Sequence, residues 1–237
     1  MIGCGTGRCG TKSLNILFGS QPDTWVTHEN VGSGFLRWGC SREEYNAKIG
    51  KLQGRCRPGR HYLSGNIAPW WLPCAEWLCA DPEIKVVCIE RNEEDTVRSL
   101  LRQRYDLFSE NPRPGMQVQG ADRNAAHPKF PGDRETAAHS YWNMYHDTAA
   151  AWAEKYPESF RVFDIDSLNS DSGQIDLLTF AGVDNPRPCP VSPGKYYLLQ
   201  NDWTHKSDVT GEPDYSTPRA TGAAKRYTKE GTERTCL

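Results

Sequence analysis

Residues 1–14 of the chain read M-I-G-C-G-T-G-R-C-G-T-K-S-L, and this stretch decides the fold. Apolar residues at positions 2 and 4 predict the end of a short buried strand, and a helix is expected over residues 11–18. Three glycines separate the two elements: Gly5, Gly7 and Gly10. An ordinary tight turn explains one glycine, but not three flanked by cations and hydroxyls.

A glycine loop between a strand and a helix predicts an anion site. Glycines let the backbone approach a ligand closely, the first helical N–H groups lack partners within the helix, and the helix dipole favours negative charge there. Arg8 and Lys12 add positive charge. We therefore expect a phosphate cradle formed by Gly7, Arg8, Cys9, Gly10, Thr11, Lys12 and Ser13.

The loop differs from the nucleotide-hydrolase pattern G-x-x-x-x-G-K-[ST]. Gly5 and Gly10 have that spacing, but Thr11 intervenes before the Lys-Ser pair. The order G-R-C-G-T over residues 7–11 resembles instead the 5′-phosphosulfate loop of the sulfotransferase family, whose members use 3′-phosphoadenosine 5′-phosphosulfate (PAPS).

A second part of the chain carries the same resemblance. Residues 84–89 are a nearly continuous apolar run, as a strand buried on both faces requires. Arg91 follows the strand, and Ser99 lies eight residues later in a helix expected over residues 93–108. In the family, an Arg and a Ser so placed hold the 3′-phosphate of the cofactor, and the planar guanidinium suits phosphate. The alternative for Arg91 is a surface ion pair with an acidic residue of that helix.

The candidate base follows the strand expected over residues 24–27. His28 and Glu29 end that strand, and the carboxyl ends of parallel strands share one edge of a sheet. We therefore expect both side chains close to the phosphate loop, with Glu29 favoured as the general base and His28 second. The alternative is a helix cap or a supporting hydrogen bond.

The loop departs from the common cytosolic form of the family, which has Lys where this chain has Arg8 and Ser where it has Cys9. Arg does not readily donate a proton, so Arg8 is expected to act electrostatically. Lys12 is the nearby amine that is able both to stabilise negative charge and to donate a proton. Cys9 is expected to be a small loop residue rather than a nucleophile.

Length and composition narrow the class of protein. The 237 residues suffice for one α/β domain with a sizeable core. A net charge of −2 gives no indication of nucleic-acid binding, and no apolar run has membrane-spanning length. The nine cysteines show no metal-ligand spacing, and a reduced, cytoplasmic compartment is the simpler prediction, although a disulfide framework stays possible. The loop begins almost at residue 1. Either the first strand is short, or further residues, which could include a membrane anchor, precede Met1.

The remaining pattern predicts a three-layer α/β domain with a central, mostly parallel sheet over residues 1–185. Its other elements are a short strand and turn at 61–65, a further strand at 160–165 and four helices at 41–52, 67–80, 136–156 and 171–181. Residues 109–135, rich in Pro and Gly, are expected to form a lid. The polar extension over residues 186–237 is expected to pack on or cap the same domain, where Lys225, Arg226 or Lys229 would reach the 3′-phosphate.

The resemblance implies transfer of a sulfuryl group from PAPS to a hydroxyl or amine of a small-molecule or carbohydrate acceptor, leaving 3′,5′-ADP and requiring no metal. A rival hypothesis is a P-loop kinase or nucleotide hydrolase that uses ATP–Mg²⁺, with Asp164 at the end of an apolar strand as a magnesium ligand. A third is a catalytically inactive module that binds PAPS or a glycan. The sequence predicts neither the acceptor nor the oligomeric state.

Overall fold

The computed structural model describes residues 1–29, 35–54, 63–103, 105–110 and 125–189, and all of these belong to one compact unit, Met1–Pro193. The basic residues predicted to return to the phosphate site, Lys225, Arg226 and Lys229, lie outside the described residues. So do most of the predicted extension over 186–237 and the centre of the predicted lid.

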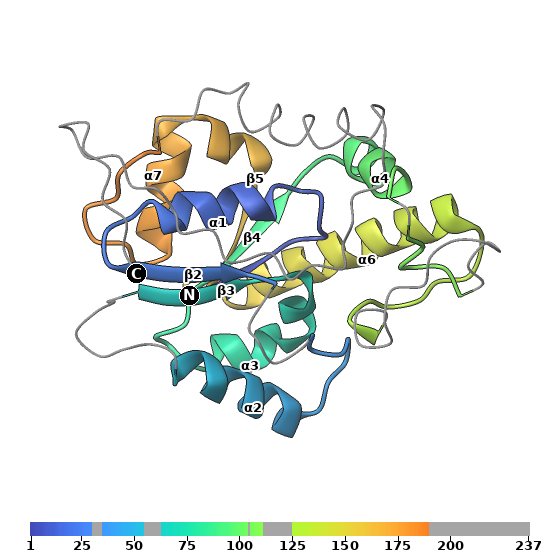
Figure 1. The fold of residues 1–237 in the computed structure, drawn as a ribbon, viewed down its shortest axis with the longest axis horizontal. Helices are drawn as coiled ribbons and strands as arrows, with labels where there is room; N and C mark the ends of the chain where they lie inside the picture. The colour runs from blue at the N-terminus through green and yellow to red at the C-terminus, as the bar shows by residue number, and fades with distance from the viewer. Residues whose placement is uncertain (30–34, 55–62, 104, 111–124, 190–237) are drawn as a thin grey trace, which may run out of the picture. The chain divides into compact units, whose positions relative to one another are not determined.

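A five-stranded parallel sheet forms the centre of this unit (Figure 1). The strands are β1 (Ile2–Cys4), β2 (Thr24–His28), β3 (Leu63–Ile67), β4 (Val86–Glu90) and β5 (Phe160–Asp164). Their order is β2-β3-β1-β4-β5, and β1 lies between β3 and β4, with Gly3 in register with Ile67 on one side and Val87 on the other. All carboxyl ends therefore share one edge, and the loop that follows β1 lies in the middle of it.

Helices cover both faces of the sheet, which confirms the predicted three-layer α/β fold. They are α1 (Thr11–Gly19), α2 (Arg42–Gln53), η1 (Pro69–Cys74), α3 (Ala75–Cys79), α4 (Glu93–Leu101), α6 (Arg134–Lys155), η2 (Ile165–Asn169) and α7 (Asp171–Phe180), where η marks a 3-10 helix. Helices α1 and α7 pack on one face through a core that includes Leu14, Phe18 and Leu177. Helices α2, α3 and α6 and the 3-10 helix η1 pack on the other (Figure 1).

The third strand, β3, continues to Ile67, two residues beyond the strand and turn predicted over 61–65, and residues 61 and 62 lie outside the described residues. Its sequence, L-S-G-N-I, has a weak strand pattern, because tertiary contacts determine which residues the strand contains. A Cβ at Gly65 would collide with the carbonyl oxygen of Met1. The buried Asn66 amide donates to Thr27 and accepts a hydrogen bond from the Trp71 indole at 2.7 Å.

Two predicted helices are corrected. The helix expected over 67–80 is divided, because Ile67 belongs to β3 and Pro73 lies inside the 3-10 helix η1, which precedes the short α3. The helix expected over 93–108 ends at Leu101. The guanidinium of Arg134 donates hydrogen bonds to four carbonyls at and beyond this end: Leu100, Leu101, Gln103 and Tyr105. This distant cap replaces the helical partners that those carbonyls lack.

Candidate functional site

The loop after β1 leads into a helix N-terminus that has no side-chain cap. Gly10 is the N-cap residue of α1, with a left-handed backbone (φ 105°), and the first turn contains no acidic residue. Every other described helix of eight or more residues begins with a side chain that accepts a backbone N–H: Ser41, Asn92, Asp133 and Ser170. The positive end of the α1 dipole is thus left without the usual side-chain acceptor, as an anion site requires.

Arg8, Ser99 and Arg91 meet beside this helix start, although they are far apart in the sequence. The Nε of Arg8 donates to the Oγ of Ser99 at 2.9 Å. A terminal nitrogen of Arg91 donates to the carbonyl of Arg8 at 3.2 Å. The structure therefore brings the two predicted phosphate motifs to one place, at the carboxyl ends of neighbouring strands β1 and β4.

The alternative for Arg91, an ion pair with an acidic residue of the following helix, is also present. Its NH2 group lies 3.5 Å from Oδ2 of Asp95, one turn into α4. The Arg91 side chain is only 12% exposed, however, and its backbone carbonyl accepts the indole N–H of Trp142 at 3.0 Å. Arg91 is therefore held on both sides rather than extended into solvent.

Positive charge is concentrated at this point. Burial lowers the pKa of the Arg8 guanidinium below its usual value, and the like charge of Arg91 lowers it further, whereas the negative charge of Glu29 opposes both effects. Two neighbouring guanidinium groups repel each other unless an anion lies between or beside them. A bound phosphate or sulfate dianion would relieve that repulsion.

His28 and Glu29 lie at the same edge, as predicted. His28 ends β2, and its Nε2 lies 3.0 Å from Oγ1 of Thr11, the first residue of α1. The same ring nitrogen lies 3.9 Å from Oε1 of Glu29. The Glu29 backbone N–H donates to the carbonyl of Ile67 at 2.9 Å, which anchors the chain just beyond β2 to β3. Both candidate bases are therefore held next to the predicted phosphate loop.

Two of the candidate site residues, Arg8 and Glu29, have unusual backbone conformations. The described non-glycine residues with positive φ are Asp23, Asn185, Arg8 (φ 60°) and Glu29 (φ 53°). Asp and Asn tolerate the left-handed region, whereas Arg and Glu do so at a cost. Backbone strain of this kind is concentrated at functional sites, and here both strained residues are candidate site residues.

The other predicted loop residues contribute less chemistry. Cys9 is fully buried, and burial raises its pKa to about 11, which keeps the thiol protonated and disfavours a covalent role. Gly7 adopts a left-handed conformation (φ 79°). Lys12 is exposed and Ser13 is half-buried, both in the first turn of α1.

Tyr145 of α6 lies at the candidate site, and the sequence did not reveal it. Its buried hydroxyl accepts the backbone N–H of Gly5 at 2.8 Å and donates to the carbonyl of Pro69 at 3.1 Å. Burial raises its pKa well above the usual value, so the hydroxyl keeps its proton and donates. The start of the predicted phosphate loop is thus fixed to α6 and η1. The only sequence signal is an aromatic residue in a helix, which ordinarily indicates core.

An acidic pair lies beside the loop at the ends of β4 and β5. Glu90 is in register with Asp164, and burial together with the charge of Asp164 raises the Glu90 pKa. The Nδ1 of His146 lies 3.7 Å from Oε2 of Glu90, and burial lowers the His146 pKa to about 4, so this histidine is neutral at pH 7. Asp164 itself caps η2 by accepting the N–H of Asp166.

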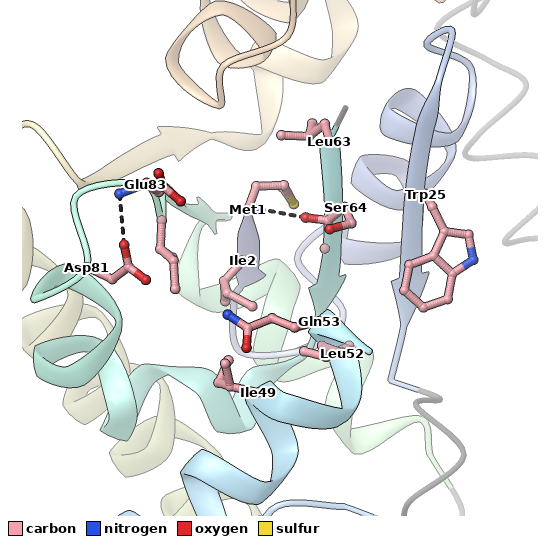
Figure 2. Close-up of a pocket in the computed structure, with 12 residues that line it drawn as sticks. Met1, Ile2, Trp25, Ile49, Leu52, Gln53, Leu63, Ser64, Asp81 and Glu83 are labelled. Atoms are coloured by element: carbon pink, nitrogen blue, oxygen red, sulfur yellow. Dashed lines mark hydrogen bonds between the residues drawn. The ribbon is translucent and has the colours of Figure 1, made fainter. Parts of the chain in front are cut away.

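A cavity of about 250 Å³ lies at the opposite edge, near the amino ends of β1 and β3 (Figure 2). The amino group of Met1 donates there to the carbonyl of Ser64 at 2.7 Å, and Asp81 and Glu83 line the other side. Ligands of parallel α/β sheets bind at the carboxyl ends of the strands. The cavity is therefore separate from the candidate site.

In residues 1–29, 35–54, 63–103, 105–110 and 125–189, no three His, Cys, Asp or Glu side chains are grouped so as to hold a metal ion. No helix in the described part of the chain combines the length and apolar character needed to cross a bilayer. The sequence matches no protein-family model, and comparison with curated proteins finds no significant relative.

Proposed function

We propose that this chain is a PAPS-dependent sulfotransferase. The observation that carries the proposal is the convergence of Arg8, Ser99 and Arg91 beside the uncapped start of α1. A nucleotide with phosphate groups at both its 5′ and 3′ positions needs two anion sites close together, and two guanidinium groups flanking a helix N-terminus meet that need.

The residues present fit such a nucleotide. The first N–H groups of α1 and Arg8 would hold the 5′-phosphosulfate, with Thr11 and Ser13 as hydroxyl donors. Arg91 and Ser99 would hold the 3′-phosphate. When bound, PAPS supplies an activated sulfuryl group, and the charge that develops on the leaving phosphate would be stabilised by Arg8 and the helix N-terminus.

The acceptor is a hydroxyl or amine of a small molecule or carbohydrate, and its proton must be removed as the new bond forms. Glu29 is the first candidate for this base and His28 the second. The contact between His28 and Thr11 favours a positioning role for the histidine, because the nitrogen that would take a proton already lies within hydrogen-bond distance of the loop. Arg8 acts electrostatically, and Lys12 remains the nearby amine able to donate a proton.

The kinase alternative has less support. Asp164, its proposed magnesium ligand, belongs to β5, which is separated from β1 by β4, and its carboxylate already caps η2. A catalytically inactive binding module would have the same anion site as the proposed sulfotransferase and would differ from it only in turnover. A measurement of turnover therefore distinguishes the two.

Calorimetric titration without metal tests the proposal, with 3′,5′-ADP, 5′-AMP and ATP–Mg²⁺ as parallel ligands. We expect 3′,5′-ADP to bind most tightly and Arg91→Ala to weaken it about 10- to 100-fold, the value of one charge-assisted contact. Arg98→Ala is the matched control, because Arg98 also pairs with Asp95 at 3.3 Å but is 59% exposed. Preference for ATP–Mg²⁺, with no gain from the 3′-phosphate, would refute the sulfotransferase.

Turnover separates the enzyme from the inactive module. Formation of 3′,5′-ADP from PAPS is measured against a panel of hydroxyl and amine acceptors. We expect Glu29→Gln to abolish turnover while 3′,5′-ADP binding is retained. Tight binding of 3′,5′-ADP with no turnover of the unmodified chain on any acceptor would favour the binding module.

A further inference from the structure

Two buried cysteines on different segments lie almost within bonding distance. The Sγ atoms of Cys40 and Cys74 are 3.5 Å apart, although the residues are 34 positions apart in the sequence. Cys40 lies in the loop before α2, and Cys74 is the last residue of η1. Both belong to the same hydrophobic cluster, with exposed fractions of 6% and 1%. A disulfide has an S–S length of about 2.05 Å, so closure needs an approach of only about 1.5 Å.

Closure requires the loop around Cys40 to move by this distance. Gly39, the preceding residue, has a left-handed backbone with no atom near the position of a Cβ, and Cys40 lies outside any helix or strand. Cys4 and Cys88 are a useful contrast. They are also neighbours, but they are paired in register across the central strands β1 and β4, and the ladder of backbone hydrogen bonds fixes their spacing.

We propose that Cys40 and Cys74 form a disulfide when the chain folds in the presence of a low-molecular-weight disulfide such as oxidised glutathione. One thiolate attacks the glutathione disulfide and releases one reduced glutathione. The second thiolate then attacks the resulting mixed disulfide and releases the other. Two protein thiols are oxidised to one S–S bond, one glutathione disulfide is reduced to two thiols, and the protons remain with the released glutathione.

Burial determines when this reaction takes place. It raises the pKa of both thiols, and an exposed thiolate is the reactive form. The folded, reduced pair therefore reacts slowly, whereas the unfolded chain exposes both thiols. Closure accompanies folding, and the finished bond is shielded from reductants in the folded state.

The crosslink would join two segments that support the candidate site. The loop that contains Cys40 also contains Trp38, whose ring packs against Tyr145 at a centroid distance of 6.1 Å. The 3-10 helix that ends at Cys74 begins at Pro69, the residue whose carbonyl accepts the Tyr145 hydroxyl. The bond would hold both contacts of Tyr145 in one rigid unit, whatever ligand the phosphate loop binds.

The test is to refold the full chain from urea in a glutathione redox buffer, block free thiols and map crosslinked peptides by mass spectrometry. We expect Cys40 and Cys74 in one crosslinked peptide pair and Cys4 and Cys88 recovered as blocked free thiols. The chain-entropy model for a crosslink of this span then predicts that the oxidised protein melts roughly 8–15 °C above the reduced one.

Cys40→Ala is the matched variant, because it removes one thiol of the pair at a position outside any helix or strand. Its melting temperature should not respond to oxidised glutathione. Peptide mapping of the unmodified chain needs no variant, so the proposal remains testable if Cys40→Ala folds poorly. Recovery of Cys40 and Cys74 as free thiols after oxidative refolding, or a Cys4–Cys88 crosslink in their place, would overturn the inference.

Discussion

Removal of one oxygen atom, in Tyr145→Phe, tests how the loop after β1, the predicted phosphate loop, is held. The Tyr145 hydroxyl is the hydrogen-bond acceptor of the Gly5 N–H and a donor to the Pro69 carbonyl, and all of these groups are buried. The phenyl ring keeps its packing in the variant, including its contact with Trp38. The change therefore isolates the two hydrogen bonds from the volume of the side chain.

The expected loss of stability follows from the two groups left without a partner. A buried donor or acceptor without a hydrogen bond costs about 1–3 kcal/mol, so the two together should lower the free energy of unfolding by about 2–4 kcal/mol after partial relaxation. For a unit of this size the melting temperature should fall by roughly 5–15 °C. The loop would also be less well ordered, and we expect 3′,5′-ADP to bind about 10-fold more weakly.

Tyr141→Phe is the matched control, because the Tyr141 hydroxyl is equally buried but has no hydrogen-bond partner within the described residues. Its loss should be neutral or slightly stabilising. The assays are urea denaturation, hydrogen exchange of the Gly5 amide by NMR, and calorimetric titration. Exchange at Gly5 should accelerate in Tyr145→Phe alone, with or without ligand. Equal stability of the two variants, with unchanged exchange at Gly5, would refute the reasoning.

Two further predictions concern the loop and the acidic pair. Gly10→Ala should destabilise the protein by about 1–3 kcal/mol and weaken 3′,5′-ADP binding, because φ is 105° and a Cβ would lie 3.3 Å from Ile165 and Leu168. Gly182→Ala, where φ is 82° and nothing lies near the Cβ, should cost only the backbone strain and leave binding unchanged. The pKa of His146 is about 4 in the folded protein and about 6.5 in the unfolded chain. As the pH falls from 6.5 to 4 the unfolded chain therefore binds a proton that the folded protein does not, and the free energy of unfolding should fall by about 3 kcal/mol. His146→Gln should flatten the unfolding free energy over that range, and Glu90, whose pKa is raised, should give a smaller trend of opposite sign.

Sequence patterns predicted those helices and strands whose own residues include an apolar run, a capping box or a terminal glycine. The apolar run before Glu90 indicated β4, and the Ser41 capping box started α2 where the structure has it. Gly182 ends α7 with a positive φ, as a glycine after a helix should. In each case the information lies within a few residues of the element that it specifies.

Long-range contacts determined what the sequence could not predict. The end of α4 depends on Arg134, more than thirty positions away, and β3 depends on the close approach of Met1 to Gly65. The candidate site likewise contains residues that local patterns predicted and one residue that only a long-range contact places there. The predicted strand ends indicated that Arg8, Arg91 and His28 share one edge of the sheet. The hydroxyl of Tyr145, in contrast, accepts the Gly5 N–H from α6, 140 positions further along the chain.

The left-handed backbone at Arg8 and Glu29 has a consequence for protein engineering. Glycine at position 29 would relieve strain of about 1 kcal/mol, so a screen that selects only for thermal stability should favour variants that have lost the Glu29 carboxylate. A glycine replacing Arg8 would gain in the same way and would also remove one of two repelling charges. Stability and the proposed chemistry therefore select different residues at these two positions, and a library sorted for both properties would reveal where they conflict.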